Sequence, residues 1–97
     1  MANYISLLQF TELGARNIKF TVNRAGAATA AAEKMGVKII DLFWTMGSYD
    51  LVLILDAPDD EAVSAFAVKL GSIGNVKTQT MRAFQREEME AILAKIK

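Results

Sequence analysis

The sequence predicts an α+β protein of order βαββαβ, with a four-stranded antiparallel sheet and an extra C-terminal helix. Short apolar segments rich in β-branched and aromatic residues alternate with helix-forming segments. Two of these strand-like segments are separated only by Gly47-Ser48, which indicates a hairpin. The chain has 97 residues, so we expect a single domain over residues 1–97 with one modest core.

The first half of the chain is predicted to form a strand and a helix. Residues 4–10 are short, apolar and aromatic at both ends, as a strand requires. Residues 11–24 have no regular pattern, and we predict irregular structure there. Residues 24–35 are rich in alanine and predict a helix, which Gly36 ends as its left-handed cap. The alanine run of residues 27–32 is interpreted as a close-packing helix face.

The second half continues with a helix, a strand and a last helix. Residues 57–61 open the helix, since proline suits a first turn and acidic residues suit the positive end of the helix dipole. Gly71 and Gly74 bracket its end, residues 76–84 form the strand, and residues 86–97 form the last helix. This order is the ferredoxin-like arrangement, in which both crossover helices cover the same sheet face.

The hairpin of residues 37–46 and 49–55 is apolar on both faces. A type II′ turn at Gly47-Ser48 would pair Trp44 with Leu51 and Phe43 with Val52. A sheet wetted on one side alternates apolar and polar residues instead. Either the last helix covers the second face, or a second copy does so, sheet against sheet. We favour a homodimer or higher homo-oligomer, with the last helix clamping the pair.

Composition excludes several classes of function. The chain has 11 basic and 11 acidic residues, and this balance argues against a nucleic-acid binder. It has no cysteine and no histidine, which removes thiolate chemistry and the commonest metal ligand. Its apolar runs are too short to span a bilayer, and it shows no signal-peptide pattern. We therefore expect a soluble cytoplasmic protein with no membrane or nucleic-acid partner, no metal site and no cofactor.

The segment of residues 42–52, Leu-Phe-Trp-Thr-Met-Gly-Ser-Tyr-Asp-Leu-Val, resembles the GYD domain family. The resemblance implies a ferredoxin-like fold of the dimeric α+β barrel group and no assigned activity. Members tend to carry a polar residue and then a proline near Phe20, and a small hydroxyl residue where this chain has Gln85. The first departure would expose Phe20 or seat it in a partner. Similar stretches are residues 4–8, 16–19, 57–61 and 78–84.

Two polar groups of residues are candidates for a ligand site. Tyr49 and Asp50 either meet at a pocket mouth or serve the turn, with Asp50 bonding nearby backbone amides. Thr78, Thr80 and Arg82 alternate along one strand and therefore share a face, which Ser6 joins from the neighbouring strand. They form either an anion-binding floor or the polar side of an edge strand.

Other polar and aromatic residues have both a functional and a structural interpretation. Arg16, with Asn17 and Lys19, either closes over an anionic ligand or forms a solvated surface. Trp44 either stacks on a ligand or packs in a core or interface. The acidic residues 59–61 mark a helix start better than a metal site. No catalytic set emerges, and the ligand-binding candidates are Ser6, Arg16, Trp44, Tyr49, Asp50, Thr78, Thr80 and Arg82.

Three functions stay open. The first is a small domain that dimerises through its sheet and binds a small, partly apolar or anionic ligand between sheet and helices. The second is a cofactor-independent oxygenase or isomerase of the dimeric α+β barrel type, by analogy of fold alone. The third is a regulatory or interaction subunit of a larger protein, for which an exposed Phe20 would be the first sign. The lack of histidine and cysteine favours binding over catalysis.

Overall fold

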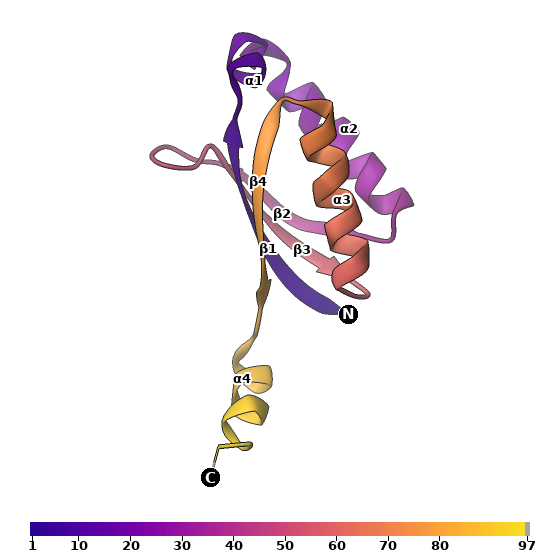
Figure 1. Cartoon of the computed structure of the whole chain (residues 1–97), viewed down its shortest axis with the longest axis vertical. Helices are drawn as coiled ribbons and strands as arrows, with labels where there is room; N and C mark the ends of the chain where they lie inside the picture. Colours follow the sequence, from indigo (N-terminus) through magenta and orange to yellow (C-terminus); the bar gives the residue numbers. More distant parts are fainter. Residues whose placement is uncertain (97) are drawn as a thin grey trace.

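The computed structural model describes residues 1–96 and confirms the predicted α+β architecture. The sheet has the strand order β2-β3-β1-β4, and every neighbouring pair is antiparallel. The strands are β1 (Ala2–Phe10), β2 (Lys38–Trp44), β3 (Leu51–Ala57) and β4 (Val76–Ala83). The helices are α1 (Glu12–Arg16), the 3-10 helix η1 (Ile18–Phe20), α2 (Thr21–Lys34), α3 (Asp60–Ile73) and α4 (Arg86–Leu93) (Figure 1).

Both long crossover helices, α2 and α3, cover the same face of the sheet, as the topology predicts (Figure 1). The core lies between them and the strands, where Phe66, Leu55 and Val37 are the largest fully buried side chains. Buried and partly buried residues alternate along β1 because of this packing: Tyr4, Ser6 and Leu8 are buried beneath the helices.

The opposite face of the sheet carries no helix in the described part of the chain. In Figure 1, α4 lies beyond the end of β4 and does not fold back over the strands. The last helix therefore does not supply the cover that was one of the two alternatives. It also ends at Leu93, earlier than the predicted residue 97, which itself lies outside the described residues.

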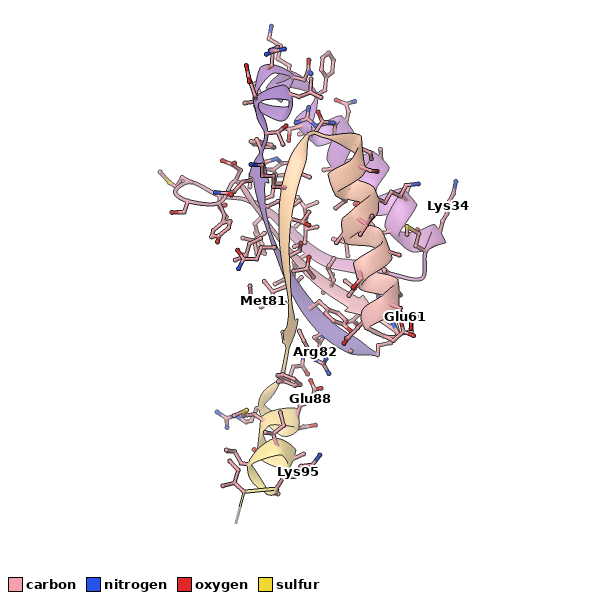
Figure 2. All side chains as sticks on the ribbon, viewed as in Figure 1. Lys34, Glu61, Met81, Arg82, Glu88 and Lys95 are labelled. Atoms are coloured by element: carbon pink, nitrogen blue, oxygen red, sulfur yellow. The ribbon has the colours of Figure 1, made fainter. Side chains whose placement is uncertain are left out.

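This uncovered surface is apolar at its centre. Ile5 stands between Ile54 and Met81 of the neighbouring strands. Leu7 pairs with Val52, which in turn pairs with Phe43. In Figure 2, Met81 points away from α3. We call this surface the open sheet face, and it consists of Ile5, Leu7, Phe43, Val52, Ile54 and Met81.

The hairpin register is confirmed, but its predicted two-residue turn is wrong. Trp44 pairs with Leu51 and Phe43 with Val52, and Gly47 has the expected positive φ of +105°. The strands nevertheless end at Trp44 and resume at Leu51, so residues 45–50 form a wider loop. Asp50 bonds to both neighbouring strands here: its carbonyl accepts from the Thr45 N–H at 2.8 Å, and its own N–H donates to the Leu8 carbonyl of β1 at 2.8 Å.

The expectation of irregular structure over residues 11–24 is also wrong. The Thr11 hydroxyl accepts a hydrogen bond from the Gly14 N–H at 3.2 Å and caps α1. The helix η1 follows, and α2 begins at Thr21, ahead of the predicted start. This segment folds helically because local capping satisfies its backbone donors, which an apolar periodicity does not reveal.

The helix α3 begins later in the sequence than predicted, because Asp59 caps it. Ala57 still belongs to β3, and Pro58 precedes the helix instead of forming its first turn. The Asp59 carboxylate accepts from the Ala62 N–H at 2.9 Å, so the helix begins at Asp60. Its end is confirmed at Gly74, which has a φ of +92° and closes the helix in the left-handed conformation.

Candidate functional site

A polar groove of about 450 Å³ lies between α3 and β4. The predicted alternation is confirmed here, because Thr78, Thr80 and Arg82 all line it. Ser6 joins this face from β1, and its hydroxyl lies 2.9 Å from that of Thr80. The Tyr4 hydroxyl donates to the Asp60 carboxylate at 2.5 Å at one end of the groove. The structure thus brings four of the predicted ligand-binding residues together.

Arg82 is held by several partners within the chain. Its Nη2 donates to the Glu88 carboxylate at 2.8 Å, which ties β4 to the first turn of α4 (Figure 2). Its Nη1 donates to the carbonyls of Asn3 and Ala83. The guanidinium also lies over the Phe84 ring, 4.5 Å from its centroid. Glu88 already neutralises Arg82, and these three bonds leave two of the five guanidinium N–H donors for an anion.

Two titratable groups in this region have shifted pKa values. The hydrogen bond to the Asp60 carboxylate raises the pKa of the Tyr4 phenol, and burial of the ring acts in the same direction. The hydrogen bond from Arg82 lowers the pKa of Glu88, and the Gln85 N–H, which donates to it at 3.1 Å, adds to the effect. The raised pKa keeps the Tyr4 phenol protonated as a donor, and the lowered pKa keeps the Glu88 carboxylate ionised as an acceptor.

Acidification is expected to loosen α4 from β4. Because the folded pKa of Glu88 lies below its ordinary value of 4.5, the stabilising contribution of the ion pair is present above that value. It is lost as the pH falls through the folded pKa. Glu88→Gln should show faster amide hydrogen exchange in α4 already at neutral pH, whereas the exposed neighbour variant Glu87→Gln should not. Equal exchange in both variants would contradict this role.

The hairpin candidates turn toward different partners. The Asp50 carboxylate accepts from the Phe10 N–H at 2.8 Å and so fixes the end of β1. The Tyr49 hydroxyl donates to the Gln79 side chain at 3.0 Å, on the other side of the sheet. The structure therefore gives Asp50 the backbone-bonding role that was one of its two interpretations. Ligand binding by either residue stays a prediction.

Trp44 and Arg16 lie outside the polar groove. The Trp44 indole N–H donates to the Thr21 hydroxyl at 3.0 Å, and the side chain is 45% exposed. Arg16 pairs with Glu12 at 2.9 Å on the surface of α1. This ion pair is exposed and contributes little to stability. The structure does not bring these two residues to the groove.

A second hollow is an apolar cavity of about 340 Å³ between α2, α3 and the sheet. The sequence predicted a ligand between sheet and helices, but none of the candidate site residues lines this cavity. The alanine run was expected to pack closely, but only Ala32 is fully buried, while Ala28 and Ala31 line the cavity. The small size of the alanine side chains was the feature of the sequence that could have indicated this cavity. Its titratable lining residues are Arg24 and Lys69, so no acid faces a base across it.

A third feature is an exposed apolar tip at α1, η1 and the start of α2. Phe20 is 60% exposed in the single chain, which is compatible with both outcomes expected from its departure from the family pattern. Single exposed apolar residues are ordinary, whereas several on successive elements favour an interaction site. The apolar tip consists of Leu13, Ile18, Phe20 and Val22.

No helix within residues 1–96 has the length and hydropathy needed to cross a membrane. Across the same residues, no three acidic side chains gather closely enough to hold a metal ion. A further hollow of about 430 Å³ is lined by Thr29, Glu33 and residues 36–39. The described chain thus offers the open sheet face, the apolar tip and three hollows.

Comparison with known proteins agrees with this architecture. The family model of the GYD domain matches residues 4–93, nearly the whole chain. This chain belongs to the GYD domain family. The "Glutamine synthetase and cystathionine beta-lyase binding protein" of Thermus thermophilus is 29% identical over 94 residues, which cover 96% of this GYD domain chain and 99% of that protein.

Solved structures share the fold of this GYD domain. TTHA0845 from Thermus thermophilus has a TM-score of 0.58 at 22% identity, covering 88% of this chain and 95% of that one. FFRP-DM1 has a TM-score of 0.63 at 16% identity, covering 87% and 100%. MtbAldR has a TM-score of 0.67 at 14% identity over 88% of this chain, which spans only 54% of that longer chain. These likenesses confirm the ferredoxin-like fold.

Proposed function

We propose that this GYD domain is a binding protein that acts by docking, as a homodimer, onto a metabolic enzyme. The observation that carries the proposal is the relative named for binding glutamine synthetase and cystathionine β-lyase, which matches over nearly the full length of both chains. These two enzymes are therefore the first partners to test. A partner of this class implies a cytoplasmic location.

The open sheet face supports the homodimer. A sheet face in contact with water would carry polar residues at alternate positions, but here apolar side chains form a continuous centre. Phe43 is 53% exposed and Met81 39% exposed in a single copy. Polar residues surround this centre, with Gln79 bonded to Tyr49 and Asn3 bonded to Asp56. An apolar centre with a polar rim is the usual composition of a protein interface.

The apolar tip supports docking onto a different protein. It lies at the far end of the molecule from α4, on the helices that follow β1 (Figure 1). A sheet-to-sheet dimer would leave it accessible, because its residues belong to helices and not to the open sheet face. Phe20 and Val22 are the most exposed members, at 60% and 67%. Aromatic side chains of this kind are frequent anchors of protein interfaces.

Phe20→Asp is expected to abolish enzyme binding while the dimer persists. If Phe20 fills a pocket on the partner, its loss should weaken binding at least about thirtyfold. Biolayer interferometry with purified glutamine synthetase and cystathionine β-lyase of the same organism measures the dissociation constant. Val68→Asp, at a position of α3 that is 72% exposed, is the matched control and should bind as the wild type does. The proposal fails if neither enzyme binds the wild type, or if Phe20→Asp leaves the affinity unchanged.

A further inference from the structure

We propose that the cavity between α2 and α3 binds a small amphipathic carboxylate. Its apolar body would lie between the helices, and its carboxylate would face Thr21, Arg24 and Lys69. This site goes beyond the proposed docking function and is independent of it. It involves neither the open sheet face nor the apolar tip.

The cavity exists because α2 presents alanines where larger side chains would be needed. Ala25, Ala28 and Ala31 line one wall, and Phe66 and Leu70 of α3 line the opposite wall. A methyl group on α2 is too short to close the gap between the helices. The volume of about 340 Å³ is at the lower end of the range for small-molecule pockets, roughly 300 to 1,000 Å³. The floor consists of Leu8, Ile39, Leu42, Leu51 and Leu53.

The charged residues of the lining are both cations. Within residues 1–96, neither Arg24 nor Lys69 forms a salt bridge with a carboxylate. The Arg24 guanidinium is held in place by the carbonyls of Asn17, at 2.6 Å, and Gly14, at 3.2 Å. It also lies 5.9 Å from the centroid of the Phe10 ring. These contacts orient the guanidinium without neutralising it, and they leave three of its five N–H donors.

Thr21 adds a neutral donor beside Arg24. The two residues are three positions apart on α2 and therefore share a face. The Thr21 hydroxyl accepts a hydrogen bond from the Trp44 indole, so its own hydrogen is left for an acceptor. Two cations and a hydroxyl donor in the lining of a mostly apolar cavity suit an anionic ligand with an apolar body, such as a carboxylate. An ammonium ligand is disfavoured, because no acidic residue lines the described cavity.

The test compares octanoate with the neutral octanol and the cationic octylammonium in ¹H–¹⁵N NMR titrations of the full chain. Octanoate should shift the amides of cavity residues such as Ala28, Leu53 and Phe66. Octanol should bind about tenfold more weakly or worse, because it lacks the charge-assisted hydrogen bonds. Octylammonium should not bind at the cavity. Equal affinity for octanoate and octanol, or shifts confined to Leu7 and Val52 of the open sheet face, would overturn the proposal.

Paired variants separate the site from general effects on the fold. Ala28→Leu should fill the cavity, abolish octanoate binding and raise the melting temperature, whereas Ala30→Leu on the exposed side of α2 should leave binding intact. Lys69→Gln should weaken octanoate severalfold without affecting octanol, and Lys34→Gln at the end of α2 should change neither (Figure 2). Unchanged octanoate binding in Ala28→Leu would overturn the proposal. Phe20→Asp should still bind octanoate, so failure of this site and failure of enzyme docking remain distinguishable.

Discussion

Val52→Asp is expected to convert the proposed homodimer into a folded monomer of 10.6 kDa. Val52 lies at the centre of the open sheet face, between Leu7 and Phe43. In a sheet-to-sheet dimer an aspartate here would be buried without a partner, at a cost of about 3–5 kcal/mol. That cost weakens the dimer at least about hundredfold. The single copy should keep its fold, because the Val52 side chain is only partly buried in it.

Size-exclusion chromatography with light scattering measures this change in mass. The matched control is Val68→Asp, which places the same charge on the exposed side of α3, at a position that is 72% exposed. The control should elute as the wild type does, at twice 10.6 kDa. If Val52→Asp and Val68→Asp have the same mass as the wild type, the open sheet face is not the dimer interface.

Gly14→Ala is expected to destabilise the fold by about 3 kcal/mol. A Cβ at this position would lie 2.0 Å from the Asn75 carbonyl oxygen, far inside van der Waals contact. That carbonyl cannot move away freely, because it accepts a hydrogen bond from the Thr11 N–H at 3.0 Å. The Thr11 hydroxyl also donates to the neighbouring Gly74 carbonyl at 2.5 Å. The close approach of α1 to the α3–β4 connection therefore requires glycine.

Gly26→Ala is the matched control for this substitution. Nothing lies within 4 Å of a Cβ at Gly26, which is in the interior of α2. Alanine there should stabilise the helix by about 0.5–1 kcal/mol. Urea denaturation of both variants gives the two free energies of unfolding. Opposite signs are expected, and a Gly14→Ala variant as stable as the wild type would refute the steric argument.

The parts of the fold that the sequence predicts correctly are those with a short repeating pattern. The alternation of β4 placed Thr78, Thr80 and Arg82 on one face, and the hairpin register followed from the position of Gly47. The wide loop could not be predicted in this way, because it depends on Asp50 bonding to a strand forty residues away in sequence. Such a contact appears in no local pattern.

The candidate site residues were likewise predictable where they depend on strand pairing, and not where they depend on contacts between distant elements. Ser6 and Thr80 could be matched because antiparallel neighbours in a known topology have a defined register. The pairing of Arg82 with Glu88 depends on the direction in which α4 leaves the sheet, which no periodicity specifies. The lining of the cavity was missed because an alanine-rich helix either packs closely or leaves a gap, depending on the distance to its neighbour. The sequence shows side-chain size but not that distance.

The central claim is that two copies meet through the open sheet face and leave the apolar tip free. Isotope-filtered NOE spectroscopy on a mixture of labelled and unlabelled chains observes contacts between copies directly. The expected result is a set of intermolecular NOEs among the side chains of Ile5, Leu7, Val52 and Met81, with none to Phe20. Intermolecular NOEs from α2, α3 or the apolar tip, or none from the open sheet face, would contradict the account.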